Sequence, residues 1–188
     1  MSLIKFFALK PLTALLAAGL ICTTLAAWAS GDSKLATIHE SIKKEFAAVQ
    51  HIDATQLALM PPAEIVIFDV REQSEFDISH LAGAIRVSPD ISAHQFIDAH
   101  AEKTSGKTLI FYCSVGQRSS HLADRLRKGL SDYGTGRIYN LQGGIFNWHN
   151  EKRALVSQST TTDYVHPYSS YWGRLLERPE MIRYKLEN

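Results

Sequence analysis

Charge of one sign is the most evident thing this sequence lacks. Its 188 residues include 20 Lys and Arg against 19 Asp and Glu, and no basic stripe is interleaved with aromatic residues. Proteins that bind a phosphate backbone carry such a stripe, so we expect no nucleic-acid partner. The eight histidines show no spacing such as His-x-x-x-His, and we therefore expect no metal site.

Long apolar runs are also scarce, and the one clear example lies at the N-terminus. Lys5 and Lys10 are followed by the apolar stretch Pro11–Leu25 and by the small-x-small cleavage signal Ala27-Trp28-Ala29. This order is typical of an export signal, and the run is too short for a membrane span. We predict that residues 1–29 direct export to the bacterial periplasm and are removed; an uncleaved N-terminal anchor is the alternative.

Cysteine is nearly absent. Only Cys22 and Cys113 occur, and Cys22 falls within the predicted signal, so the mature chain would have one thiol. A single cysteine cannot form an internal disulfide, and in an oxidising compartment an unpaired thiol is a liability unless it has a task. Cys113 is therefore a candidate nucleophile; the alternative is that it is a small buried hydrophobic residue.

The surroundings of Cys113 favour the nucleophile. Leu109–Tyr112 is a short β-prone run, and the apolar residues after the cysteine recur at helical spacing (Leu122, Leu126 and Leu130), which predicts strand, tight loop and helix. In an open α/β sheet, ligands bind at such a junction. The helix N-terminus brings partial positive charge, which favours the thiolate, the form that attacks.

Three of the residues that follow Cys113 suit the chemistry of a nucleophilic thiolate. Gly116 lets the loop curl tightly, since it has no Cβ and can adopt positive φ. Arg118 offers a planar, permanently charged group for an anionic substrate. Ser119 is predicted to be the N-cap of the following helix.

The rest of the chain alternates between strand and helix patterns, which indicates an α/β fold with a parallel sheet and helices on both faces. Asp53 is expected to cap the first short helix. His80 is expected to be a hydrogen-bonded turn residue and Trp148 a core residue. The predicted strands are 64–68, 81–87, 109–112 and 137–141, and the predicted helical segments are 35–49, 54–60, 72–78, 91–100, 120–130 and 145–151.

Three stretches, in order, resemble the rhodanese-like sulfurtransferases. They are Phe68–Ile85, with Asp-Val-Arg-Glu and His-Leu-Ala-Gly-Ala; Cys113–Ser119, a Cys-x-x-Gly-x-Arg-Ser pattern; and Tyr139–Trp148, with Asn-Leu-Gln-Gly-Gly. The related phosphatases and arsenate reductases have one more residue before the arginine, so the loop length resembles the sulfurtransferase branch.

The resemblance implies a function. Cys113 would take a sulfane sulfur from an anionic donor, thiosulfate or a persulfide, and pass it to a thiol or cyanide, with no cofactor. The loop residues Ser114, Val115, Gly116, Gln117, Arg118 and Ser119 would bind substrate, with Asp69 and Arg71 as support. Some thiosulfate-using members have basic residues where this chain has Ser114 and Val115, which makes thiosulfate a less expected donor. The alternative is a non-catalytic module that binds a partner or senses redox state.

The domain limits follow from these patterns. We expect a helical extension over residues 30–50, the rhodanese-like domain over 51–156, and a tail over 157–188 that begins with a polar linker. The tail is too rich in aromatic residues to be disordered, so we expect it to pack on the domain. It could instead form a dimer or partner surface, or a lid that places His166 or Arg174 over Cys113.

Overall fold

The computed structural model describes residues 29–131 and 136–186. The predicted export signal lies outside these residues apart from Ala29. Within the two described ranges, no helix is long and apolar enough to cross a membrane.

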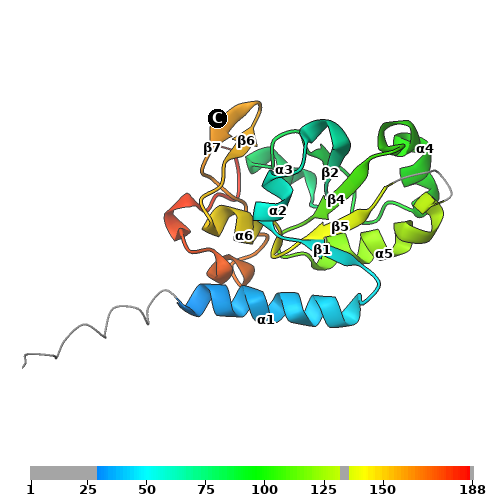
Figure 1. The fold of residues 1–188 in the computed structure, drawn as a ribbon. Helices are drawn as coiled ribbons and strands as arrows, with labels where there is room; N and C mark the ends of the chain where they lie inside the picture. The colour runs from blue at the N-terminus through cyan, green and yellow to red at the C-terminus, as the bar shows by residue number, and fades with distance from the viewer. Residues whose placement is uncertain (1–28, 132–135, 187–188) are drawn as a thin grey trace, which may run out of the picture.

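A five-stranded parallel sheet forms the centre of the molecule, in the order β1-β5-β4-β2-β3 (Figure 1). The predicted α/β class is therefore confirmed. The strands are β1 (Gln50–Ile52), β2 (Ile65–Asp69), β3 (Ile85–Arg86), β4 (Thr108–Tyr112) and β5 (Ile138–Leu141). Because β4 is the middle strand, the residue that follows it emerges at the centre of the sheet edge.

Helices cover both faces of this sheet. They are α1 (Ala29–Glu45), α2 (Ala54–Ala58), α3 (Gln73–Ile78), α4 (Ala93–Thr104), α5 (Gln117–Ser131) and α6 (Gly144–Asn150). Side chains alternate along β4, so Leu109 and Phe111 join one buried cluster with α4 and α5, whereas Ile110 and Tyr112 join another with α2 and α6. This alternation follows from the two-residue period of a strand.

Several boundaries differ from the sequence prediction. The strand expected over 81–87 contains only the two residues of β3, and the three-residue strand β1 was not predicted. The expected polar linker is a hairpin of β6 (Leu155–Ser157) and β7 (Thr160–Thr162). Asp53 caps α2 through a full capping box, as predicted.

The N-terminal helix and the C-terminal segment lie against each other. Figure 1 shows α1 (blue) beside the orange and red end of the chain, where α1 contacts the short 3-10 helix η2 (Trp172–Leu175). Val165 and Leu175 of the tail are buried in the same cluster as Ile110 of β4. A second 3-10 helix, η3 (Pro179–Met181), follows, and Val165 exchanges backbone hydrogen bonds with the residues around it.

Two histidines, His39 (buried) and His51 (half-buried), pack α1 onto the sheet, and they predict sensitivity to acid. The rings of His39 in α1 and His51 in β1 lie 4.8 Å apart, edge to face. Burial, with the charges of His39 and Lys43 outweighing that of Glu40, lowers the pKa of His51 to about 4. The unfolded chain therefore binds more protons below about pH 6.5, so stability is complete above that value and falls as the pH drops toward 4.

We expect the urea concentration at the unfolding midpoint to be lower at pH 5 than at pH 7. The difference between the two pH values should be smaller in His51→Phe. This variant retains an aromatic ring but removes the titrating group. His94→Phe is the matched control, because the His94 side chain is 86% exposed on α4. An equal loss of stability in His51→Phe and the unmodified protein would show that His51 does not contribute.

Candidate functional site

Cys113 lies in a four-residue loop between β4 and α5 and is 2% exposed. The backbone N–H of Gly116 donates a hydrogen bond to Cys113 Sγ, with an N to S distance of 3.2 Å. Gly116 has a φ of +105°, and a Cβ at this position would lie 2.9 Å from Asn140 Nδ2. The positive φ therefore favours glycine here, and a Cβ would in addition require the Asn140 amide to shift.

The first turn of α6 holds the loop from the other side. The N–H groups of Ile145 and Phe146 donate to the carbonyl oxygens of Cys113 and Ser114, at 2.9 and 3.1 Å. Gly144 allows this approach, because its φ is +57° and a Cβ there would lie 2.3 Å from the Cys113 oxygen. The position of the nucleophile thus depends on a glycine 31 residues further along the chain.

An ion pair between the buried Glu75 and the partly buried Arg118 stabilises the loop. Arg118 Nη1 and Nη2 donate to the two carboxylate oxygens of Glu75 at 2.8 and 2.9 Å, and Nη2 also donates to Ser114 Oγ at 3.0 Å. The Ser114 hydroxyl donates to Glu75 Oε1 at 2.9 Å. Burial raises the pKa of Glu75, but the hydrogen bond and charge of Arg118 lower it further, so the carboxylate is ionised.

This pairing changes the expected role of Arg118. We expected a free positive charge for an anionic substrate, whereas the guanidinium is compensated by a carboxylate that the sequence analysis did not select. Glu75 is the third residue of the short helix α3 and closes a capping box with Glu72. Nothing in a single sequence links it to an arginine 43 residues away.

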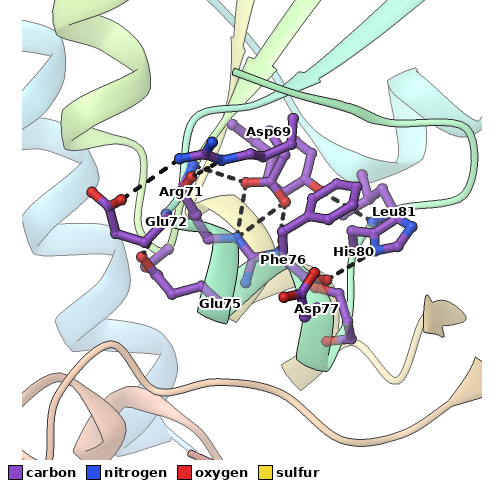
Figure 2. A network of polar contacts seen from close by, with 12 residues as sticks. Asp69, Arg71, Glu72, Glu75, Phe76, Asp77, His80 and Leu81 are labelled. Atoms are coloured by element: carbon purple, nitrogen blue, oxygen red, sulfur yellow. Dashed lines mark hydrogen bonds and ion pairs between the residues drawn. The ribbon is translucent and has the colours of Figure 1, made fainter. Parts of the chain in front are cut away.

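A second buried ion pair lies at the end of β2. Asp69 and Arg71 are joined by bonds of 2.6 Å (Nη2 to Oδ2) and 2.9 Å (Nε to Oδ1), and both side chains are 0% exposed. Figure 2 shows Asp69 and Arg71 side by side at this strand end. Arg71 also donates to the Ser79 carbonyl at 2.6 Å. Asp69 pairs in register with Tyr112, so this ion pair supports the strand end from which Cys113 emerges.

The tail provides an outer wall for the site. A cavity of about 200 Å³ is lined by Cys113, Ser114, Val115, Gln117, Arg118, Tyr168 and Trp172. The Tyr168 ring lies 4.7 Å from Arg118 Cζ. The N–H of Tyr168 donates to Nδ1 of buried His166 at 3.0 Å, which fixes the backbone beside the cavity.

Comparison with known proteins identifies the domain that holds this loop. The family model of the rhodanese-like domain matches residues 48–151, more than half of the chain. The chain belongs to the rhodanese-like domain family. The match ends before the tail, so Tyr168 and Trp172 lie outside the rhodanese-like segment.

The chain is also similar over part of its length to two other proteins, and in its fold to a solved structure. The chain is 31% identical over 94 residues to a tRNA uridine(34) hydroxylase of Bacillus velezensis, which covers 47% of this chain and 27% of that protein. It is 34% identical over 88 residues to YqhL of Bacillus subtilis, which covers 47% and 64% of the two chains. The fold resembles a thiosulfate sulfurtransferase from Pseudomonas aeruginosa, with a TM-score of 0.50 and 18% identity over 75% of this chain and 26% of that one.

The remaining predicted residues of the rhodanese-like loop are not all at the cavity. Val115 and Gln117 line it, and Gln117 Nε2 also donates to Glu45 at the end of α1 at 2.9 Å. Ser119 is buried, and its hydroxyl donates to Asn140 Oδ1 at 2.6 Å. It is not the N-cap, because α5 begins two residues earlier, at Gln117.

The tail does not place Arg174 at the site. Arg174 lines a separate cavity with Lys34 and Ile38 of α1. His166 is buried near Glu75 and Arg118; burial and the charges of Arg71 and Arg118 lower its pKa, while Glu75 opposes this effect. A neutral ring leaves Nδ1 able to accept the Tyr168 N–H, so His166 holds the tail in place.

His80 and Trp148 lie outside the loop, and their contacts test the predictions made for them. His80 Nδ1 lies 3.0 Å from the Phe76 carbonyl and its ring stacks on Phe76 at 3.8 Å, so the predicted hydrogen bonding is present. The residue does not lie in a turn as predicted, because its backbone pairs with Val156 in an isolated antiparallel bridge. Trp148 is only partly buried, and its indole N–H donates to the Ala154 carbonyl at 3.0 Å. It therefore lies at the edge of the core.

Proposed function

We propose that this protein is a sulfurtransferase that carries a sulfane sulfur as a persulfide on Cys113. The observation that carries the proposal is the Gly116 N–H, 3.2 Å from Cys113 Sγ, in a loop held from both sides. A backbone donor aimed at sulfur stabilises the thiolate before the reaction and the persulfide anion after it. The cavity above Cys113 gives a small donor access to a thiol that is otherwise buried.

The proposed reaction has two steps. The Cys113 thiolate attacks the outer sulfur of the donor, the sulfur–sulfur bond of the donor breaks, and the remaining fragment leaves with the electron pair. A thiol or cyanide acceptor then attacks the terminal sulfur of the persulfide and regenerates the Cys113 thiolate. Each step exchanges one bond to sulfur for another, so neither a cofactor nor a metal ion is required.

The two ion pairs have positioning roles in this scheme. Glu75 and Arg118 fix Ser114 and the second half of the loop, and Asp69 and Arg71 fix the end of β2 beside the strand that bears Cys113. Neither pair exchanges a proton with the substrate. We propose that the protein works after export, where the predicted loss of Cys22 would leave Cys113 as its single thiol.

The hydroxylase activity named for some relatives is not proposed here. The matched segment is 27% of the length of the Bacillus velezensis protein, so the likeness concerns one part of that enzyme. The cysteine loop supports sulfur transfer directly, through the contact between Gly116 and the sulfur.

We expect the reduced protein to gain the mass of one sulfur atom when it is exposed to a sulfane sulfur donor. Dithiothreitol should reverse the gain, and Cys113→Ser should show none, because the sulfur must attach to this thiol. Intact-mass spectrometry after exposure to thiosulfate, and separately to an organic persulfide, measures both. The absence of any gain would contradict the proposal and favour a non-catalytic module.

A further inference from the structure

Tyr168 is held at the Cys113 cavity against a local backbone cost. Its φ is +62°, a conformation that is unfavourable for a bulky residue and is kept only where the surrounding structure imposes it. The hydrogen bond to His166 and the packing of Val165 in the core impose it here. Tyr168 is nevertheless 50% exposed, so its own burial does not explain the strain.

Two aromatic rings therefore border the nucleophile on the side that the tail provides. Trp172 lines the same cavity, with Val115 of the loop as a further apolar wall. At about 200 Å³ the cavity has room for a donor that carries a further group besides the sulfur–sulfur bond that reacts. Flat apolar groups bind against aromatic rings in such a setting.

The charges around Cys113 disfavour the binding of a sulfur donor that carries two negative charges. The Cys113 thiolate and the Glu75 carboxylate bring two negative charges, and Arg118 brings one positive charge. The Arg71 charge is already compensated by Asp69 at 2.6 Å. The site is thus negative overall when it is ready to react, and each additional negative charge on a donor is unfavourable.

We propose that the sulfur donor of this protein is a singly charged organic sulfane sulfur compound, and that Tyr168 and Trp172 bind its apolar group. This inference rests on the proposed sulfurtransferase function. For a thiosulfonate, the Cys113 thiolate attacks the terminal sulfur and the bond to the sulfonyl sulfur breaks. The electron pair leaves with the sulfinate, and the persulfide remains on Cys113. The total charge is conserved and no oxidant is consumed.

Benzenethiosulfonate and thiosulfate form a matched pair of probes. Both release their outer sulfur by breaking the same kind of bond, but benzenethiosulfonate has one negative charge and a flat ring, whereas thiosulfate has two charges and no apolar group. The measured quantity is the ratio of kcat/KM for benzenethiosulfonate to that for thiosulfate, with cyanide as acceptor. Using the ratio within each variant removes differences in folding and in the acceptor step.

We expect Tyr168→Gly to lower this ratio about tenfold, since the variant removes the ring that contacts the donor. Glycine adopts positive φ without strain, so the variant should fold. Tyr164→Ala is the control, because Tyr164 is an exposed aromatic residue of the same tail that lines a different cavity. An unchanged ratio in Tyr168→Gly would overturn the inference, while sulfur gain on Cys113 from either donor would leave the proposed function intact.

A second variant tests the effect of the negative charge at the site on the choice of donor. Glu75→Gln keeps the shape of the side chain but removes one negative charge beside Arg118, and we expect it to lower the ratio about tenfold by improving the use of thiosulfate. A ratio that does not move in Glu75→Gln would overturn the charge argument. Failure of both donors to modify Cys113 in the unmodified protein would instead overturn the sulfurtransferase function itself.

Discussion

Replacing Asp69 by Ala is expected to lower the free energy of unfolding by about 3–5 kcal/mol, because it leaves a buried arginine without its counter-charge. Arg71 is 0% exposed and receives its main compensation from Asp69, through bonds of 2.6 to 3.1 Å. Burial lowers the pKa of Arg71, but the charge and hydrogen bonds of Asp69 raise it further. The guanidinium therefore stays ionised in the fold and needs a partner. Urea denaturation at pH 7 measures the change.

Two further variants separate this effect from a general sensitivity to lost ion pairs. Asp124→Ala removes the partner of Arg127 on the surface of α5, where both side chains are about 40% exposed, and we expect a loss below about 1 kcal/mol. The double variant Asp69→Ala, Arg71→Met should recover most of the stability lost in Asp69→Ala. A loss in Asp69→Ala as small as that in Asp124→Ala would contradict the prediction.

The central elements of the fold could be predicted because their signals are local. The strand β4 is a continuous apolar run, α5 repeats leucine at helical spacing, and Asp53 with Gln56 forms a capping box. Each signal lies within a few residues of the element that it specifies. Strands of two or three residues, such as β3 and β1, are too short to produce a hydrophobic period and depend on neighbours in the sheet.

The hairpin of the tail was missed for a conformational reason. Its turn consists of Gln158 and Ser159, with φ values of +48° and +69°. Two-residue hairpin turns of this kind are usually marked by Asn-Gly or Asp-Gly, and this sequence has neither at that point. The surrounding threonines and serines then resemble a linker, although the strands pair fully.

Only part of the site could be predicted from the sequence, because the other residues are distant along the chain. Cys113, Gly116 and Arg118 lie within six residues of one another, so their chemistry can be inferred from the loop alone. Tyr168, which lines the same cavity, lies 55 residues after the cysteine, and Glu75, which pairs with Arg118 behind it, lies 38 residues before. Their roles depend on tertiary packing, and this packing determines whether Arg118 is free or paired.

Gly144→Ala is expected to reduce sulfur transfer to Cys113 about 100-fold, because a displacement of about 1 Å in a reacting group has an effect of this size. A Cβ on residue 144 would lie 2.3 Å from the Cys113 carbonyl oxygen and 2.7 Å from that of Ser114. Both atoms belong to backbone, so the loop or α6 has to move. The hydrogen bond from Ile145 to Cys113 would be lost or stretched.

The matched control for this variant is Gly106→Ala. Gly106 also has a positive φ, +69°, but a Cβ there would meet no atom within 4 Å. Gly106→Ala therefore reports the backbone strain alone, about 1–2 kcal/mol of stability, with sulfur transfer unchanged. Gly144→Ala adds the overlap with the loop, so it should lose more stability than the control as well as its reactivity. The rate of mass gain on Cys113 and the urea midpoint distinguish the two effects. If Gly144→Ala lost only as much stability as Gly106→Ala and kept its reactivity, the contact between α6 and the loop would not be what positions the nucleophile.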